Sequence, residues 1–208
     1  MGFTELAGIK LPKALFEAAK SGELVVFAGA GVSMQGKTPL PDFGSLVEGV
    51  SQKVDAERKL NPFDKKNDSC EEYLGELETL YGEAVRTECT QMLSAGTCAE
   101  VHRHIISLFE SGPIRVVTTN FDLRFEQAAD ELSVQVRVFS GPALPVGDSF
   151  EGLVHLHGSL EYPGEMVLSD SDFGKAYVSD GWASPDRLAE AEMRRNRVRS
   201  GFFERAHC

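Results

Sequence analysis

The sequence predicts an α/β protein with a largely parallel sheet. Continuous apolar runs of the kind that form strands buried on both faces lie at residues 23–28 and 114–119, and a further short strand is predicted at 153–156. Segments with apolar residues at helical spacing separate these runs, and strands that alternate with helices form parallel sheets. With 208 residues, the chain is long enough for one sizeable core, so we expect a single domain.

The other elements follow from apolar spacing and turn residues. Helices are predicted over 12–20, 42–54, 99–110, 123–131 and 170–178. Apolar residues at helical spacing over 70–93 predict a further helical segment with acidic residues on its opposite face. Two more strands and two loops complete the order: strands at 134–139 and 166–169, a surface loop at 61–68 and a Pro/Gly loop at 141–147.

Composition argues against several classes of function. The 32 acidic and 21 basic side chains give a net charge of −11, whereas general nucleic-acid binding needs a basic surface. No stretch approaches the ~20 apolar residues of a membrane span, and residues 1–16 lack the apolar block of a secretory signal. The four cysteines form no Cys-x-x-Cys pair, so we expect no disulfide framework, no structural zinc and a cytoplasmic location.

The charge is unevenly distributed along the chain. Residues 1–186 hold 15 basic and 29 acidic side chains, a net −14, whereas residues 187–208 hold 6 Arg and 3 Glu, a net +3. We therefore expect a basic tail over 185–208. It is either a helix that docks on a partner or subunit, a solvated end, or the mark of a shortened or frame-shifted relative of longer proteins.

Polar clusters follow the three main predicted strands: Gly29-Ala-Gly-Val-Ser33, Thr118-Thr-Asn-Phe-Asp122 and His155-Leu-His-Gly-Ser159. Parallel sheets bind ligands beyond the carboxyl ends of their strands, so these clusters form the candidate site. In the first cluster, glycine permits a positive φ and lets the backbone N–H groups approach a phosphate; a simple tight turn is the alternative. Met34 stands where the dinucleotide fingerprint needs glycine and P-loop spacing is absent, which excludes an ordinary Rossmann dehydrogenase and a Walker-type NTPase.

The other two clusters also have structural alternatives. Asn120 and Asp122 lie where a strand passes into a helix, and both residue types are favoured helix caps. His157 is either a site residue or a satisfied structural histidine. His155 points to the same side if the strand continues, and we expect it to be buried without a catalytic role.

Taken in order, the motifs Phe27-Ala-Gly-Ala-Gly-Val-Ser33, Leu40-Pro-Asp-Phe43, Thr-Thr-Asn-Phe-Asp and Leu-His-Gly-Ser resemble the sirtuin family. The resemblance implies a three-layer, mostly parallel Rossmann-like sheet that binds NAD. It implies NAD contacts for seven residues: Gly29, Ala30, Gly31, Ser33, Asp42, Phe43 and Thr118. It implies catalytic roles for Asn120, His157 and Asp122.

The sequence departs from deacetylating sirtuins at two places. No cysteine follows Ser159 over residues 160–177, so we expect the zinc module and the adjoining acyl-lysine groove to be missing, and Gly44 stands where an arginine is usual. The chain is similar instead to bacterial sirtuin-like domains of antiphage defence proteins, which hydrolyse NAD. Residues 168–173, Leu-Ser-Asp-Ser-Asp-Phe, also resemble a segment of those defence domains.

This resemblance implies hydrolysis of NAD to nicotinamide and ADP-ribose without a metal, by a homo-oligomer or together with a partner defence protein. Asn120 would orient the water or the ribose hydroxyls, and His157 would act as the base. Asp122 and Asp42 would hold the carboxamide or the pocket walls, and Phe43 would shield the cation. Two alternatives stay open: a non-catalytic NAD or ADP-ribose binding module that regulates a partner, and a zinc-free deacylase.

The sirtuin-like domain is expected over residues 1–184. In similar domains, a segment like Gly181-Trp-Ala-Ser184 leads to a further helix and an apolar strand whose loop contacts the adenosine half of NAD. No such apolar strand follows Leu168 in this sequence. We therefore expect a truncation on the C-terminal side, an exposed sheet edge and an incomplete adenosine pocket.

Overall fold

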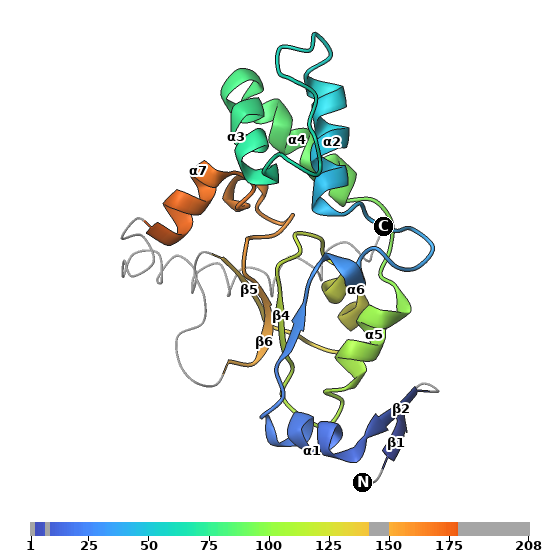
Figure 1. Cartoon of the computed structure of the whole chain (residues 1–208). Helices are drawn as coiled ribbons and strands as arrows, with labels where there is room; N and C mark the ends of the chain where they lie inside the picture. Colours follow the sequence, from blue (N-terminus) through green and yellow to red (C-terminus); the bar gives the residue numbers. More distant parts are fainter. Residues whose placement is uncertain (1–2, 7–8, 142–149, 179–208) are drawn as a thin grey trace, which may run out of the picture.

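The computed structural model describes residues 3–6, 9–141 and 150–178. Its main sheet has the strand order β3-β4-β6-β5, and every neighbouring pair is parallel. The strands are β3 (Val26–Ala28), β4 (Arg115–Thr118), β6 (Gly152–His155) and β5 (Val138–Ser140). The predicted α/β class with a parallel sheet is confirmed (Figure 1).

One face of the sheet packs against three helices: α1 (Lys13–Ser21), α5 (Glu100–Ser107) and α6 (Arg124–Glu131). The core between them contains Ala19 of α1, Ile106 of α5, Phe125 of α6, and Val116 and Leu153 of the central strands. Packing of the helices against this face buries these side chains and removes them from water. This layer holds the carboxyl ends of β3, β4 and β6 side by side.

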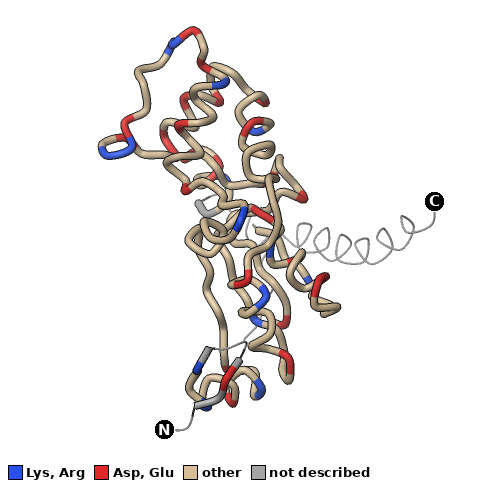
Figure 2. Tube along the Cα trace, turned by 90° about the vertical axis from the view of Figure 1, so that its right-hand side faces the viewer, with Lys and Arg blue, Asp and Glu red and all other residues tan. Residues whose placement is uncertain are grey.

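Three further helices form a separate module beyond the carboxyl ends of the strands (Figure 1). They are α2 (Phe43–Val54), α3 (Cys70–Tyr81) and α4 (Glu83–Leu93). The module has its own core, which includes Leu46, Leu74 and Val85, and Met166 and Leu168 from the segment after β6 pack into it. Acidic residues, red in the tube of Figure 2, recur along these helices; α3 alone carries Glu71, Glu72, Glu76 and Glu78.

The remaining elements are short. An antiparallel hairpin of β1 (Phe3–Leu6) and β2 (Ile9–Pro12) precedes α1. Single 3₁₀ turns, η1 (Ala30–Val32) and η2 (Pro163–Glu165), follow β3 and β6. The helix α7 (Asp170–Phe173) continues into a π-turn, η3 (Gly174–Val178).

Several predicted elements differ from the structure. Gly82 takes a φ of 57° and divides the segment predicted as helical over 70–93 into α3 and α4. The segment 166–169 does not form a strand. Its last residue, Ser169, caps α7 with its side chain. The strand predicted at 134–139 is limited to β5, and the hairpin at the N-terminus was not predicted.

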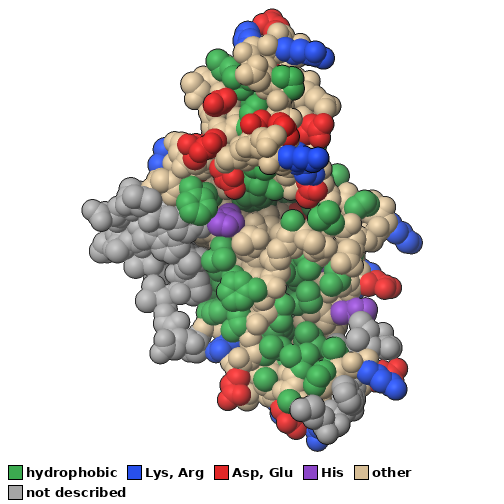
Figure 3. All heavy atoms as spheres, viewed as in Figure 1, with side chains coloured by type: hydrophobic (Ala, Val, Ile, Leu, Met, Phe, Trp, Pro, Cys, Tyr) green, Lys and Arg blue, Asp and Glu red, His purple; other side chains and the backbone are tan. Residues whose placement is uncertain are grey.

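The prediction that residues 23–28 form a strand buried on both faces is also wrong. Phe27 is 73% exposed, and β3 is the edge of the sheet among the described residues. Phe27 lies in register with Val117 and, through it, with Val154 and Phe139, so one row of apolar side chains crosses the sheet. Figure 3 shows hydrophobic side chains gathered on the face over the sheet.

Some expectations fall outside the described residues. They are most of the Pro/Gly loop at 141–147, the segment from Gly181 to Ser184, the basic tail at 185–208 and the domain boundary between them.

Candidate functional site

A pocket of about 280 Å³ lies between the carboxyl ends of the strands and the helical module. Its lining comes from all three predicted clusters: Ala30 and Ser33 after β3, residues 119–122 after β4, and His157 after β6. The module and the segment after β6 supply the other side: Leu40, Pro41, Phe43, Leu46, Glu71, Leu93, Val167 and Phe173. Residues more than 120 positions apart in the chain therefore meet around one cavity, as expected for a parallel sheet.

The glycines after β3 do not have the positive φ that was expected of them. Gly29 has a φ of −107°, and Gly31 is not among the residues with positive φ, so neither is required by backbone conformation. A Cβ built at Gly31 meets no atom within 4 Å, and one at Gly29 meets only Thr119 Oγ1 at 3.9 Å, among the described residues. The glycines therefore leave open space along the loop, which a ligand can enter without meeting a side chain.

Asn120 ties this loop to the end of β4. Its Nδ2 donates to the Gly29 carbonyl at 3.2 Å and to Ser33 Oγ at 3.1 Å. A carbonyl oxygen only accepts, so this contact determines which end of the amide is nitrogen. The Oδ1 atom has no hydrogen-bond partner within the described part of the chain. Because Asn120 lines the pocket, Oδ1 is available as an acceptor for a ligand or a water.

A buried arginine that sequence reasoning missed supports the same loop. Arg124 is 2% exposed, and its guanidinium donates to the carbonyls of Ser33, Thr38 and Ala95 at 2.9, 2.5 and 3.0 Å. Asp122, also buried, accepts from the Arg124 N–H at 3.1 Å and lines the pocket. The one available signal was the position of Arg124 on the apolar stripe of α6, four residues before Ala128.

Two fully buried histidines flank Asn120. His155 Nδ1 lies 2.8 Å from the Asn120 carbonyl, and its Nε2 lies 2.9 Å from Glu126 Oε1. The carbonyl only accepts, so Nδ1 donates to it, and the Glu126 carboxylate accepts from Nε2 when the ring is protonated. Burial lowers the pKa of His155, but the hydrogen bond and charge of Glu126 outweigh it, and the net pKa is raised. The predicted burial of His155 is confirmed; its lack of a catalytic role stays a prediction.

The second buried histidine, His102, is electrically neutral. Its Nδ1 accepts from the Ala99 N–H at 3.1 Å, and its Nε2 lies 3.3 Å from Ser33 Oγ. Burial lowers the pKa of His102, which keeps the ring unprotonated at neutral pH. Sequence reasoning did not identify this residue, because nothing in the local pattern of α5 separates it from an ordinary core position.

His157 lies on the wall of the pocket, and the ring of Phe173 lies 5.9 Å from its own. Burial lowers the pKa of His157, and the charge of Glu71 raises it by less, so the net pKa is below the ordinary 6.5. The ring is therefore neutral at physiological pH and is able to accept a proton.

Four of the predicted NAD contacts are not among the residues that line the pocket: Gly29, Gly31, Asp42 and Thr118. Asp42 caps α2 by accepting from the Ser45 N–H at 2.7 Å, and Lys65 Nζ lies 2.7 Å from the same carboxylate. The hydrogen bond from Lys65 lowers the pKa of Asp42. Thr118 is buried and accepts from the Asn120 N–H at 3.0 Å. These last two position lining residues, Phe43 and Asn120; direct contact of any of the four with NAD stays a prediction.

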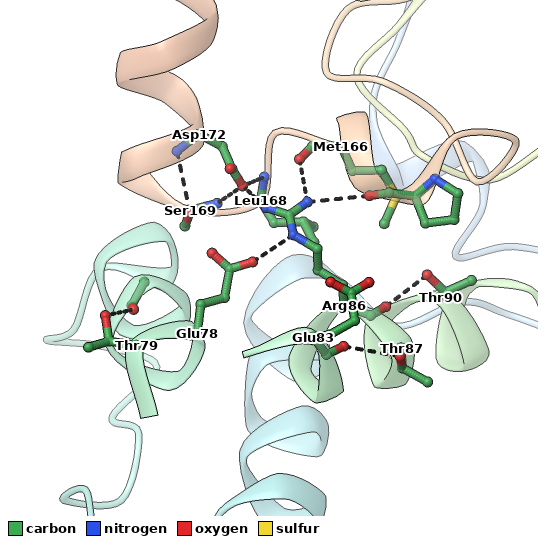
Figure 4. A network of polar contacts seen from close by, with 12 residues as sticks. Glu78, Thr79, Glu83, Arg86, Thr87, Thr90, Met166, Leu168, Ser169 and Asp172 are labelled. Carbon is green, nitrogen blue, oxygen red and sulfur yellow. Dashed lines mark hydrogen bonds and ion pairs between the residues drawn. The ribbon is translucent and has the colours of Figure 1, made fainter. Parts of the chain in front are cut away.

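Arg86 joins the helical module to the segment that carries Val167 and Phe173 (Figure 4). Its guanidinium donates to the carbonyls of Met166 at 2.9 Å and Pro163 at 3.3 Å, and pairs with Asp172. Its Nε lies 2.9 Å from Glu78 Oε1. Asp172 also accepts from the backbone N–H groups of Leu168 and Ser169, both at 3.2 Å. This network holds the far rim of the pocket.

The described residues contain no group of three or more His, Cys, Asp or Glu side chains arranged to hold a metal ion. Cys70, Cys89 and Cys98 are free thiols. Within the same residues, no helix has both the length and the apolar character to cross a membrane.

Comparison with known proteins gives one family match and one relative. Residues 114–202 match the family model described as the SIR2-like domain, a match that includes Asn120, Asp122 and His157. The chain is also 29% identical over 199 residues to the uncharacterized protein y4cA of Sinorhizobium fredii (strain NBRC 101917 / NGR234). That alignment covers 85% of this chain but only 16% of the length of the relative. The parallel four-stranded sheet is Rossmann-like, and the family match supports a sirtuin-like fold.

Proposed function

We propose that the protein hydrolyses NAD to nicotinamide and ADP-ribose in the cytoplasm, as an antiphage effector that depletes the NAD of an infected cell. The observation that carries this proposal is the pocket in which Ser33, Asn120, Asp122 and His157 meet from three strand ends. SIR2-like domains use NAD, and the match to that family supports NAD as the substrate.

The chemistry requires little proton transfer to the leaving group. Nicotinamide departs as a neutral molecule from a cationic ring when the bond between ribose C1 and the ring nitrogen breaks. The ribose then carries the positive charge, and dipoles already in place stabilise it. In the proposal, Asn120 Oδ1 accepts a hydrogen bond from the attacking water or from a ribose hydroxyl.

His157 completes the reaction as the base. The water oxygen bonds to ribose C1, and one water proton passes to the neutral imidazole. Since burial holds the pKa of His157 below 6.5, the ring is in the required state at neutral pH. In the proposal, Asp122 and Asp42 hold the carboxamide or the pocket walls. The apolar lining, including Phe43, restricts access of bulk water to the cation.

The direct test is release of free nicotinamide from NAD, measured by chromatography. We expect Asn120→Ala and His157→Ala to reduce the rate by about 100-fold or more, a typical loss for a positioned polar group or a general base. His104→Ala, on α5 and outside the pocket lining, is the matched control. Full activity in either pocket variant, with an unchanged melting temperature, would contradict the assignment.

Two further arms separate the alternatives. Protection of the protein from melting by ADP-ribose, without nicotinamide release, would indicate a binding module instead of an enzyme. Release that depends on an added acylated peptide would indicate a deacylase. For the cellular role, we expect cells that express the wild-type protein, but not Asn120→Ala, to resist phage infection and lose NAD.

The mode of regulation is part of the same proposal. In the rhizobial relative, the matched segment belongs to a much larger protein, which supports regulation by other domains, by a partner defence protein or by a homo-oligomer. Light scattering of the purified chain, with and without co-expressed neighbouring genes, measures the assembly state.

A further inference from the structure

The Ser33 hydroxyl receives hydrogen bonds from two neighbours. Asn120 Nδ2 donates to Ser33 Oγ at 3.1 Å, and this direction is certain because the Gly29 carbonyl determines the orientation of the amide. His102 Nε2 lies 3.3 Å from the same oxygen. Either atom of this second contact could be the donor, so its direction depends on the tautomer of His102.

A backbone contact determines that tautomer. The Ala99 N–H donates to His102 Nδ1 at 3.1 Å, so Nδ1 carries the lone pair. In a neutral imidazole the other nitrogen then carries the proton. His102 Nε2–H therefore donates to Ser33 Oγ. Both acceptor positions of the hydroxyl are occupied, and its own proton is left to point elsewhere.

The same argument excludes another interpretation. A serine next to a buried histidine resembles the start of a catalytic dyad, in which the histidine takes the serine proton. His102 Nε2 already carries a proton and cannot accept a second one from Ser33. The pair therefore does not generate a serine nucleophile.

We propose that His102 is a positioning residue which, together with Asn120, makes the Ser33 hydroxyl a hydrogen-bond donor directed into the pocket toward an anionic oxygen of the ligand. Ser33 lines the pocket, and open space adjoins Gly31 in the same loop. An oxygen that already accepts two hydrogen bonds is also a stronger donor, because hydrogen bonds in a chain polarise one another. For a nucleotide, the matching group is a phosphate; this identity, though not the proton arrangement, rests on the proposed function.

A double-mutant cycle tests the proposal. The ligand is ADP-ribose, which carries the phosphates but no nicotinamide bond to hydrolyse, and calorimetry measures its affinity. We expect Ser33→Ala to weaken binding about tenfold, as for loss of one charge-assisted hydrogen bond, and His102→Leu to weaken it about threefold to tenfold. In the Ser33→Ala background, His102→Leu should have no further effect, because His102 acts through Ser33.

Two variants control for packing. His102→Gln places an amide N–H near the position of Nε2, so it should restore affinity to within about twofold of the wild type. His104→Leu makes the same substitution on the same helix outside the pocket lining and should not change affinity. Independent, multiplying effects of the Ser33 and His102 substitutions, or no rescue by glutamine, would assign His102 a merely structural role and overturn the proposal.

A ligand-free measurement examines the proton arrangement alone. In protein labelled with ¹⁵N-histidine, we expect His102 to show the Nε2–H tautomer at neutral pH; the Nδ1–H tautomer would overturn the inference whatever the substrate. The two proposals therefore fail separately. ADP-ribose binding with a coupled cycle but no nicotinamide release refutes hydrolysis alone, whereas nicotinamide release with an uncoupled cycle refutes the role of His102 alone.

Discussion

The two walls of the pocket are held in different ways. On the sheet side, Ser33 and Asn120 are held by several buried polar groups: the guanidinium of Arg124, the two histidines His102 and His155, and the carbonyl of Gly29. On the opposite side, Phe43, Leu46 and Leu93 belong to or pack against the apolar core of the helical module, and the rim with Val167 and Phe173 is joined to that module through Arg86.

The difference in support fits the different requirements of an apolar and a polar wall. Apolar contacts have no direction, so an apolar wall shields a ligand even when its side chains shift slightly. A polar wall must place individual atoms, and a misplacement of about 1 Å can cost about 100-fold in rate. Many partners therefore fix the polar wall, whereas the rim of the apolar wall depends strongly on one guanidinium.

The largest expected effect comes from removing that guanidinium. Arg86→Met leaves Glu78 and Asp172 as poorly exposed carboxylates without their cation, and two carbonyls without their donor. We expect a loss of about 4 kcal/mol in the free energy of unfolding, measured by urea denaturation, and a higher KM for NAD. Lys53→Met, which breaks the exposed pair with Glu88, is the control and should cost less than about 1 kcal/mol. Equal losses in both variants would contradict a special role for Arg86.

Removing one polar contact on the sheet side of the pocket should reduce the free energy of unfolding somewhat less. Glu126→Leu leaves the buried His155 Nε2 without a partner, and we expect a loss of about 3 kcal/mol. Glu126→Gln preserves a hydrogen bond and should cost about 1 kcal/mol. Glu131→Leu, on the same helix but half-exposed, is the control for helix propensity and burial.

The same pair predicts a pH dependence of stability. The folded-state pKa of His155 is raised, so its charged form stabilises the fold below the ordinary pKa near 6.5, and this contribution is lost as the pH rises through the folded-state pKa. Glu126→Gln should remove this part of the slope. A slope of the same size in the variant would show that another group causes it.

A smaller effect is expected at the rim of the apolar wall. Phe173 is 45% exposed, so Phe173→Ala should change the free energy of unfolding by about 1 kcal/mol or less. Its ring lies near His157 and lines the pocket, and we expect the KM for NAD to rise about fivefold. Phe27→Ala makes the same truncation at an exposed position outside the pocket lining and should leave the KM unchanged.

The smallest effect concerns the pH profile of activity. The acid limb of kcat should have its midpoint below 6.5, because burial lowers the pKa of His157. Glu71 raises that pKa, so Glu71→Gln should move the limb to still lower pH. Glu72→Gln, one residue further along α3 and outside the pocket lining, should not move it. An acid limb that stays in place in the Glu71 variant would contradict His157 as the titrating base.

The sequence predicts the polar clusters that line the pocket, but it does not predict the residues that support them. Apolar runs locate β3, β4 and β6, and a parallel sheet then brings Ser33, Asn120 and His157 together. The supporting residues are different, because their partners lie far away in the chain. Ser33 and His102 are 69 positions apart, and Arg86 and Met166 are 80 apart. No local periodicity marks such contacts.

Two wrong predictions, the single helical segment over 70–93 and the buried strand at 23–28, both come from considering one segment alone. Counting apolar spacing over 70–93 ignores the backbone of Gly82, whose positive φ separates the two helices. An apolar run such as that of β3 indicates a strand, but the exposure of Phe27 depends on whether a neighbour covers it. Spacing describes one segment, whereas burial depends on the whole sheet.

The parallel pairing of β3 with β4 has a consequence for how the protein is made. Val26 pairs with Val116, so the first strand of the sheet leaves the ribosome about 90 residues before its partner. The pocket lining extends from Ala30 to Phe173, and a nascent chain has no complete pocket until the last of these residues has emerged. Distant pairing of this kind is slow to form. For a hydrolase of its own host's NAD, as proposed, an unfinished chain would then be harmless to the cell that makes it.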